Sequence, residues 1–323
     1  MGPCILITGA TGFIGGRVAA LAAAHPGPGT VRLLVRRPDV RAAQPPVPGG
    51  PRTTTVPGDL LDPGSLSRAV EGADVLIHCA SAIGADEEQA RAVNDEGTRA
   101  LVDAATRAGV GRIVALSTAS VHGRGPFHAA TPGSGLPLAP GSVTSRTRAA
   151  GERHVLDAGG TVLRPHLVYG AGDRQVIPGL VRLLTALPGR LDGGTSLHSL
   201  IDVEALAGAL LGAALSPATE PGPYYAVHPE PVPVGELITA AEGLLVPRAG
   251  VTEGPATDLA GARELLAGLS FARHHLDMLA TDHWFVDARP WRDLGCDPGP
   301  RFTDGFAAHR PWYREAVRRA TVG

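Results

Sequence analysis

The amino-acid sequence predicts an α/β fold: a doubly wound parallel sheet followed by a smaller, mostly helical C-terminal lobe. Short apolar runs alternate with helical stretches in the first half, which is the pattern of a parallel sheet covered on both faces. Glycines follow the first run at a regular spacing. Beyond Pro165 the alternation stops, and helical periods are separated by dense glycine and proline. We therefore expect one domain over 1–165, to which later segments return, and a substrate-binding lobe over 166–323.

The expected elements follow this order along the chain. Strands are expected over 4–8, 31–36, 53–56, 74–78, 112–117 and 160–164, and helices of the first half over 13–24 and 87–108. Helical periods of the lobe occur near 180–187, 203–215, 237–245 and 260–276, and only short strands fit between them. The proline-rich stretch 45–51 is interpreted as a surface loop.

Composition excludes several classes of function. The net charge of −2 offers no field that would gather nucleic acid or anionic lipid. All 29 basic residues are arginine, so every mechanism that needs a lysine amine is excluded. The three cysteines lie far apart, and no apolar run approaches the roughly 18–20 residues that span a bilayer. We expect a soluble, cytoplasmic protein with neither a membrane nor a nucleic-acid partner.

The glycine-rich segment after the first strand predicts a dinucleotide site. Gly9 can take the tight turn between strand and helix, Gly12 lets the backbone approach a pyrophosphate, and Gly15 allows the helix to pack closely on the strand. A strand before the segment and a helix after it are typical of a Rossmann-type fold. The residues expected to contact the dinucleotide here are Gly9, Thr11, Gly12, Phe13 and Ile14.

The GxxGxxG spacing resembles that of the extended short-chain dehydrogenase/reductases, the NAD-dependent epimerase/dehydratase-like group. Further motifs that match this family are Asp59-Leu60, Cys79-Ala80-Ser81, Asn94 with Gly97-Thr98, and Arg164-Pro165 with Val168-Tyr169-Gly170. The resemblance covers nearly the whole chain. It implies a nicotinamide cofactor and a pocket between the sheet and the lobe. The cofactor contacts that it implies are Asp59, Leu60, Cys79, Ala80, Ser81, Pro165 and Leu167.

The end of the second strand indicates which nicotinamide cofactor binds. An acidic residue there would accept hydrogen bonds from the 2′-hydroxyl of NAD, whereas an arginine accommodates the 2′-phosphate of NADP. The sequence has Arg36 and Arg37, and Asp39 follows only after Pro38. A guanidinium offers a planar fork of donors that matches phosphate oxygens. We therefore expect NADP(H), held at this point by Arg36 and Arg37.

The catalytic residues that the resemblance implies are only partly present. A typical family member takes a proton from the tyrosine of Y-x-x-x-K and holds the carbonyl oxygen with a Ser/Thr hydroxyl. Ser117-Thr118 resembles the hydroxyl motif, and Thr118 falls at the catalytic position. Thr144 and Arg148 replace the tyrosine and the lysine. A threonine is far too weak an acid, and an arginine stays charged, so Arg148 can bind the cofactor ribose but cannot relay a proton.

The proton therefore needs another source, and water, His122, His166 and an acidic hydroxyl of the substrate are the alternatives. His166 is expected to line the nicotinamide pocket, whereas His122 takes a position that is usually structural. The candidate catalytic residues are Thr118, Ser117 and His166.

No metal site is expected. His274-His275 and Asp282-His283 lack a convincing third ligand, so they are interpreted as residues on a helix surface. Cys79 is interpreted as a packing residue, because no positive group adjoins it in sequence.

The segment 246–275 is relevant to the choice of substrate, because it is a candidate cover for the substrate pocket. Its apolar residues have helical spacing and belong either to a lid over a broad apolar pocket or to the lobe's own core. As a whole the chain resembles atypical ketoreductases that tailor aromatic polyketides, such as the angucyclinones of simocyclinone biosynthesis. This resemblance implies NADPH-dependent reduction of a ketone on a bulky polycyclic small molecule in antibiotic biosynthesis, by a monomer or homodimer.

Two other functions stay open. Nucleotide-sugar epimerases or reductases of this family present basic residues to a diphosphate, and Arg174, Arg182 and Arg190 could serve. A non-catalytic NADP(H)-binding sensor or scaffold is the other alternative, although such a protein has little need of Thr118 or a full substrate lobe.

Overall fold

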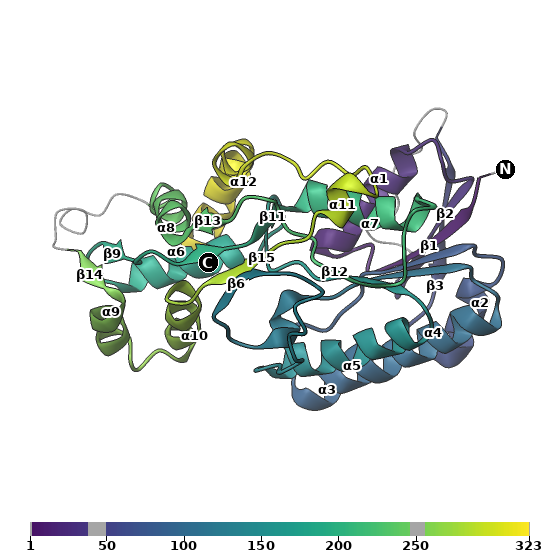
Figure 1. The fold of residues 1–323 in the computed structure, drawn as a ribbon, viewed down its shortest axis with the longest axis horizontal. Helices are drawn as coiled ribbons and strands as arrows, with labels where there is room; N and C mark the ends of the chain where they lie inside the picture. Colours follow the sequence, from purple (N-terminus) through teal and green to yellow (C-terminus); the bar gives the residue numbers. More distant parts are fainter. Residues whose placement is uncertain (1, 38–49, 246–255, 323) are drawn as a thin grey trace.

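The computed structural model describes residues 2–37, 50–245 and 256–322. At its centre lies a parallel sheet of seven strands in the order β12-β7-β5-β4-β1-β2-β3 (Figure 1). The strands are β1 (Cys4–Thr8), β2 (Thr30–Val35), β3 (Arg52–Pro57), β4 (Val75–His78), β5 (Arg112–Leu116), β7 (Thr161–Leu163) and β12 (Gly222–Tyr224). The predicted fold class is confirmed, and each of the six predicted strands lies within one residue of its expected bounds.

The strand β12 was not predicted. It lies within the range expected for the lobe but returns to the large sheet and pairs with β7, with Tyr224 opposite Leu163. Three residues that include Gly222 and Pro223 give no strand signal in the sequence. The edge position of β12 accommodates Pro223, because proline has no backbone N–H to donate and one side of an edge strand has no partner strand.

Helices cover both faces of this sheet (Figure 1). On one face lie α1 (Phe13–Ala24), α7 (Val203–Leu215) and the short α11 (Arg289–Arg292), and on the other lie α2 (Pro63–Val70), α4 (Thr98–Arg107) and α5 (Val143–Asp157). Side chains of β1 alternate between the two layers. Ile5 and Ile7 join the core under α1 and α7, while Leu6 joins the core under α2 and α4. Both faces of the strand are buried, which explains its continuous apolar run.

The helix predicted over 87–108 is interrupted. It consists of α3 (Glu87–Arg91), a π-helical turn η1 (Ala92–Gly97) and α4. The wider turn carries Asn94, and π-helical turns commonly occur at functional sites. A Cβ on Gly151 of α5 would lie 2.0 Å from the Asn94 carbonyl oxygen, so only glycine allows α5 to approach this turn.

The lobe has its own core. It is built from α6 (Val176–Ala186), α8 (Val234–Glu242), α9 (Leu259–Leu265), α10 (Ser270–Leu279) and α12 (Phe302–Val322). Its short strands are β8 (Leu167–Tyr169) with β11 (Leu200–Asp202), and β9 (Leu191–Asp192) with β14 (Thr257–Asp258). A four-stranded sheet lies between the lobe and the large sheet in the order β13 (Val232–Pro233), β10 (Leu197–His198), β15 (His283–Phe285) and β6 (Phe127–Ala130). A 3₁₀ turn, η2 (Ala119–His122), leads from β5 towards β6.

The apolar residues that suggested a lid are divided, where the structure describes them, between the lobe's own core and its surface. Leu259, Leu266 and Phe271 pack on the core of the lobe, and Leu265 and Leu269 are exposed. Helical spacing cannot say what a helix packs against, and here the lobe's own core covers its apolar face. Residues 246–255 of the expected lid lie outside the described residues.

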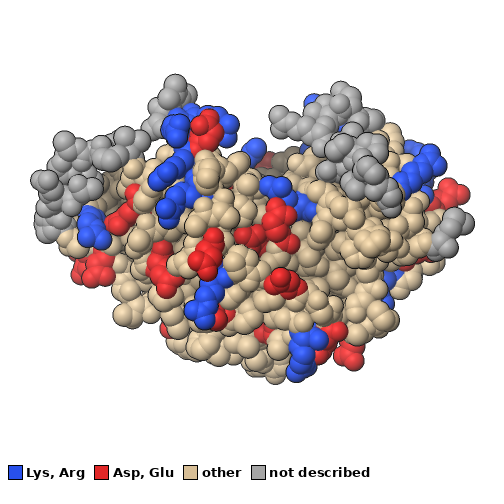
Figure 2. Space-filling model, turned by 90° about the horizontal axis from the view of Figure 1, so that it is seen from above, with Lys and Arg blue, Asp and Glu red and all other residues tan. Residues whose placement is uncertain are grey.

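Charges of both signs are interspersed on the face shown in Figure 2. Among the described residues, no helix is both long and apolar enough to cross a lipid bilayer.

Candidate active site

The turn between β1 and α1, which we call the cradle, is shaped by its glycines. Gly9 has a φ of +72°, and a Cβ there would lie 2.6 Å from the backbone nitrogen of Ala80. The Gly12 amide donates to the Gly9 carbonyl at 2.9 Å. A Cβ on Gly15 would lie 2.3 Å from the Gly9 carbonyl oxygen, so α1 can approach the turn only because Gly15 has no side chain. These geometries match the tasks predicted for Gly9 and Gly15.

A cavity of about 560 Å³ opens beside the cradle, at the switch point of the sheet between β1 and β4. Adenine dinucleotides bind at such points in doubly wound sheets, with the pyrophosphate at the helix N-terminus. The predicted cofactor residues in its wall are Gly9, Thr11, Gly12, Arg36, Asp59, Leu60, Cys79, Ala80 and Ser81. The absence of Cβ atoms at the cradle and the open start of α1 fit a bound dinucleotide.

The predicted 2′-phosphate contacts do not all reach this cavity. Arg36, which follows β2, is exposed and lines the wall. Arg37 is also exposed, but it is not part of the wall. Asp39 lies outside the described residues. Of the two arginines, only Arg36 is therefore placed to meet an adenosine ribose.

A larger cleft of about 860 Å³ lies on the other side of the cradle. The two cavities share Thr11, Gly12 and Ile83 in their walls, so they adjoin each other at the turn. The predicted residues Phe13 and Ile14 lie in the wall of the larger cleft, together with Thr118, Thr144, Arg148, His166 and Leu167. Pro165 is buried and lines neither cavity; its carbonyl accepts a hydrogen bond from the Ala119 amide at 2.8 Å.

The two neighbouring hydroxyls after β5 face different spaces. Thr118 lines the large cleft, and its Oγ1 accepts a hydrogen bond from the Ser120 amide at 3.2 Å. The hydroxyl hydrogen of Thr118 is therefore not used by this bond. Ser117 instead faces a polar cavity of about 20 Å³, the size of one water molecule. Its Oγ is buried and has no hydrogen-bond partner among the described residues.

Arg148 holds the end of β5. Its Nη2 donates to the carbonyl oxygens of Leu116 and Ser117, both at 2.8 Å. Burial lowers the pKa of Arg148 to about 10, while Glu152 and Cys79 oppose that shift. The guanidinium therefore remains charged at neutral pH. Because Arg148 also lines the large cleft, it brings a fixed positive charge to the place where the resemblance implies a lysine.

Cys79 and the histidines also have altered acidities. Burial raises the pKa of the Cys79 thiol to about 12, with Arg148 opposing, so this thiol is not a nucleophile at neutral pH. Both ring nitrogens of His122 are occupied: Nδ1 faces the Pro137 carbonyl at 3.0 Å, and Nε2 faces the Tyr225 hydroxyl at 2.9 Å. His122 is thus structural, as its position in the family motif implies.

His166 lines both the large cleft and a neighbouring cavity of about 490 Å³. Burial of the ring, together with His283 and His198 nearby, lowers its pKa well below the ordinary value. At neutral pH the ring is therefore neutral and holds no extra proton to give. The structure brings His166 to the cleft as expected, but its electrostatics do not suit the role of acid.

The interpretation of His283 as a helix-surface residue is wrong. His283 lies on β15, has 6% exposure, and its ring stacks on His166 at a centroid distance of 4.9 Å. His198 completes a group of three histidines. Sequence reasoning missed His198 entirely, because a histidine before the apolar Leu200 and Ile201 carries no metal-ligand spacing.

Asn94 links the walls of the site. Its Oδ1 accepts from the Ala82 amide at 2.7 Å and from the Ser81 hydroxyl at 3.0 Å, and its Nδ2 donates to Thr147 at 3.0 Å. It thereby ties the loop after β4 to α5. Sequence reasoning recognised Asn94 only as the first residue of the family motif that it forms with Gly97 and Thr98, and this motif was the available signal.

Comparison with known proteins shows to which family the chain belongs. A sequence model described as the NAD dependent epimerase/dehydratase family matches residues 5–227. The chain is 30% identical over 281 residues to a 2-alkyl-3-oxoalkanoate reductase of Stenotrophomonas maltophilia, covering 77% of this chain and 83% of that protein. It is 29% identical over 332 residues to a 3 beta-hydroxysteroid dehydrogenase/Delta 5-->4-isomerase of Mycobacterium tuberculosis, covering 91% and 86%.

Solved structures share the fold. The Bordetella bronchiseptica enzyme WbmH in complex with NAD+ has a TM-score of 0.74 at 20% identity, covering 98% of this chain and 99% of that one. The DesIV double mutant of Streptomyces venezuelae, a dTDP-glucose 4,6-dehydratase with NAD and DAU bound, has a TM-score of 0.72 at 23% identity, covering 96% and 97%. With the cradle, the sheet order and the matched residues together, the chain belongs to the NAD-dependent epimerase/dehydratase family.

Proposed function

We propose that the protein is an NADP(H)-dependent ketoreductase that reduces a ketone on a bulky, polycyclic small molecule. Membership of the family makes it an NAD(P)-dependent oxidoreductase. The proposal adds the phosphorylated cofactor and the substrate class. One observation carries it: the cavity beside Arg36 adjoins, at the cradle, a larger cleft whose wall is mainly apolar and includes Thr118.

The cofactor half of the proposal rests on Arg36. Its guanidinium stands at the end of β2 in the wall of the 560 Å³ cavity, where the adenosine ribose of a dinucleotide lies in this fold. A 2′-phosphate there would meet a planar fork of donors. Bound NADPH would supply the hydride.

The residues of the chain would bind and polarise the ketone. The Thr118 hydroxyl, whose oxygen already accepts from Ser120, can donate its hydrogen to the carbonyl oxygen. The charged Arg148 guanidinium stabilises negative charge that develops nearby. Neither Arg148 nor the neutral His166 can give up a proton readily at neutral pH. The proton therefore comes from water or from an acidic hydroxyl of the substrate, for example a phenol beside the ketone.

The walls of the substrate space support an apolar, polycyclic ligand. Beyond the large cleft, the 490 Å³ cavity has mainly apolar walls that include Pro126, Leu167 and Met278. This volume alone lies in the range of drug-sized ligand sites. The two relatives are named for an alkyl oxoalkanoate and a steroid, both largely apolar compounds. An aromatic polyketide of an antibiotic pathway, such as an angucyclinone, is the substrate that we propose.

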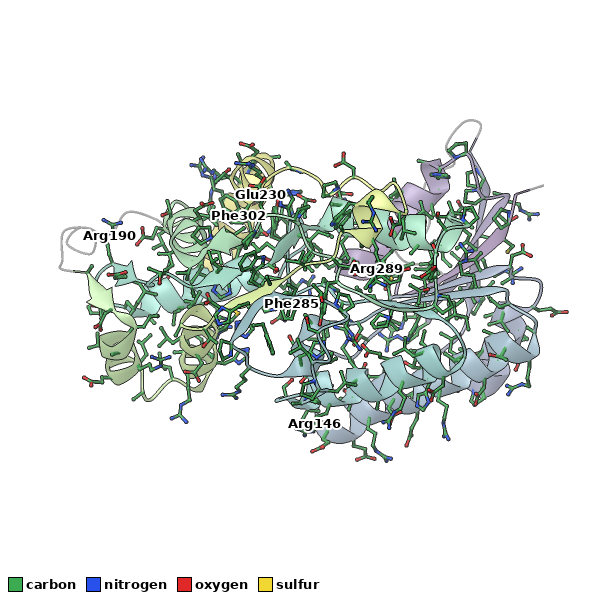
Figure 3. The ribbon with its side chains drawn as sticks, viewed as in Figure 1. Arg146, Arg190, Glu230, Phe285, Arg289 and Phe302 are labelled. Atoms are coloured by element: carbon green, nitrogen blue, oxygen red, sulfur yellow. The ribbon has the colours of Figure 1, made fainter. Side chains whose placement is uncertain are left out.

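A nucleotide sugar is the second candidate, and Arg174 favours it because it lines the large cleft. The other two arginines considered for this role are engaged elsewhere. The Arg182 guanidinium lies 4.5 Å from the Phe271 ring centroid. Arg190 pairs with Glu242 at 3.6 Å at the outer end of the lobe (Figure 3). Of the three arginines considered for a diphosphate, Arg174 alone lines this cleft.

The test is a turnover assay that follows NADPH absorbance with polycyclic hydroxyquinones and hydroxyketones on one side and UDP- and dTDP-sugars on the other. We expect turnover with the polycyclic ketones. Turnover with the sugars alone, abolished in Arg174→Ala, would contradict the substrate class. Tight NADPH binding without turnover of any compound would contradict the reductase and favour a sensor or scaffold.

A further inference from the structure

Three histidines from distant parts of the chain meet beside the substrate space. His198 and His283 are direct partners in the parallel pairing of β10 and β15, so their side chains lie on the same face of that sheet. His166 immediately precedes β8, whose Leu167 amide bonds to the Ser199 carbonyl at 3.3 Å. Their candidate ligand nitrogens all lie within 4.8 Å of one another. We call these three residues the histidine cluster.

The hydrogen bonds of two rings fix where their lone pairs lie. Nδ1 of His283 faces the Thr281 carbonyl at 2.8 Å, so it carries the hydrogen, and Nε2 carries the lone pair. Ser196 donates its only hydroxyl hydrogen to the Leu279 carbonyl. Its oxygen must therefore accept from Nε2 of His198, at 3.0 Å, and the lone pair of His198 lies on Nδ1.

The lone pairs of His166 and His198 have no hydrogen-bond donor among the described residues, whereas the His283 ring also interacts with the Arg124 backbone. Nδ1 of His198 and both ring nitrogens of His166 are buried and lack a hydrogen-bond partner among the described residues. Buried polar atoms are normally satisfied, and an exception calls for a ligand, an ion or a catalytic role. Burial lowers the pKa of all three rings, so at neutral pH the cluster is uncharged and presents three acceptors. Neutral imidazole is the form that binds transition metals.

We propose that His166, His198 and His283 form a binding site for one divalent transition-metal ion, with Zn²⁺ as the best fit. Three histidine nitrogens with a fourth position open are typical of zinc sites that accept an exogenous ligand. His166 and His283 line the 490 Å³ cavity, so the open position faces the substrate space.

The surroundings suit a cation. The Asp282 carboxylate acts electrostatically on both His198 and His283, and its Oδ1 is held by the Leu197 amide at 2.6 Å. Thr281 and Ser196 play the part of outer partners that orient metal-binding histidines.

Metal binding requires the rings to turn. Their planes are 5–15° apart, whereas in-plane lone pairs that converge on one ion need inclined planes. Zn–N bonds of about 2.0–2.1 Å also need the nitrogens to move closer together than 4.8 Å. Rotation about the last torsion of His166 can incline its ring, because that torsion is broad for histidine and both ring nitrogens lack a hydrogen bond among the described residues.

The experiment uses the full chain, purified without a polyhistidine tag and treated with chelator. Zn²⁺ is titrated calorimetrically, and Co²⁺ is titrated while its visible absorption is recorded as a report on coordination. We expect one ion per chain, a raised melting temperature with Zn²⁺, and a Co²⁺ spectrum typical of tetrahedral or five-coordinate nitrogen ligation. These readouts do not depend on enzymatic activity.

Three variants locate the site. His166→Gln, at the least buried ring of the three, should weaken Zn²⁺ binding at least 10-fold while the apo protein keeps its melting temperature. Ser196→Ala should weaken it about 10-fold, because removing an outer partner of a metal-bound histidine typically costs that much. His128→Gln is the matched control: His128 pairs with Asp282 at 3.1 Å but is not a proposed ligand, and its side chain is 64% exposed. It should bind Zn²⁺ as the unaltered chain does.

Two results would overturn the proposal. One is a chelator-treated protein that binds no stoichiometric Zn²⁺ or Co²⁺. The other is a folded His166→Gln protein that binds Zn²⁺ as tightly as His128→Gln does.

Discussion

The cradle and the histidine cluster are built in opposite ways. The cradle is formed by the backbone: Gly9 lies in the turn after β1 and Gly15 in the first turn of α1, and their missing side chains make the space. The cluster is made of side chains at 166, 198 and 283, brought together by strand pairing. Neighbours in sequence shape the first site, whereas distant segments assemble the second. A new side chain at a cradle glycine should therefore disrupt the cradle by steric clash. The cluster should be disrupted by removal of one histidine side chain or by protonation of a ring.

The largest effect is expected from Gly9→Ala in the cradle. The new Cβ would lie 2.6 Å from the Ala80 nitrogen, and the φ of +72° is unfavourable for alanine. The free energy of unfolding should fall by about 3 kcal/mol or more, and dinucleotide binding should be lost. Urea unfolding and NADPH titration measure both.

Gly72→Ala is the matched control for this change. Gly72 has a φ of +66°, but a Cβ there would meet nothing within 4 Å. Gly72→Ala should lower the free energy of unfolding by only about 1 kcal/mol and leave NADPH affinity unchanged. If Gly9→Ala behaved like Gly72→Ala, close contact with Ala80 would not be what shapes the cradle.

Acid should destabilise both regions. Burial lowers the pKa of His78, which lies behind the cradle, and of His198 in the cluster to about 4. Between pH 6.5 and about 4 the unfolded chain therefore binds more protons than the folded one. The free energy of unfolding should fall as the pH drops through this window, by roughly 3 kcal/mol for each ring.

His78→Gln and His198→Gln sharpen this comparison. Glutamine does not titrate, so in the metal-free protein each variant should show a shallower loss of stability between pH 6.5 and 4 than the unaltered chain, measured by urea unfolding at each pH. An unchanged slope in both variants would show that these rings are not the groups that take up protons on unfolding.

The two hydroxyls after β5 should differ in their effect on turnover. Thr118→Val should lower kcat of ketone reduction by about 10²-fold with little change in NADPH affinity, because the valine cannot donate to the carbonyl oxygen. Thr118→Ser should restore most of the rate. Ser117→Ala should have a much smaller effect, since Ser117 faces the small cavity. Equal losses in Thr118→Val and Ser117→Ala would remove Thr118 from its proposed role.

The smallest effect is expected at the ribose end of the cradle. Arg36→Ala should weaken NADPH binding about 10-fold and leave NADH binding nearly unchanged, because only the phosphate contact is lost. Arg37→Ala should weaken NADPH binding less than Arg36→Ala does, since Arg37 is not in the cavity wall. Calorimetric titration of both cofactors measures the difference. Tighter binding of NADH than of NADPH by the unaltered chain would contradict the cofactor assignment.

Much of the fold could be predicted from local patterns. The six strands and α1 were found because buried parallel strands read as short apolar runs, and the cradle because its glycines are fixed by the turn itself. The strand β12 and the π-helical turn at Asn94 could not be predicted, because each depends on a neighbour far away in the chain. The direction of the Thr118 and Ser117 side chains likewise depends on how η2 leaves the sheet.

By itself the sequence determined the doubly wound sheet, the cradle and the missing tyrosine and lysine, because each is a property of residue types at short, fixed spacing. Only the tertiary structure decided that Arg36 and not Arg37 lines the cavity, that α9 and α10 pack on their own core, and that three histidines meet. Strand register and burial create those relations between residues that are far apart in the chain. A local sequence pattern cannot predict such contacts.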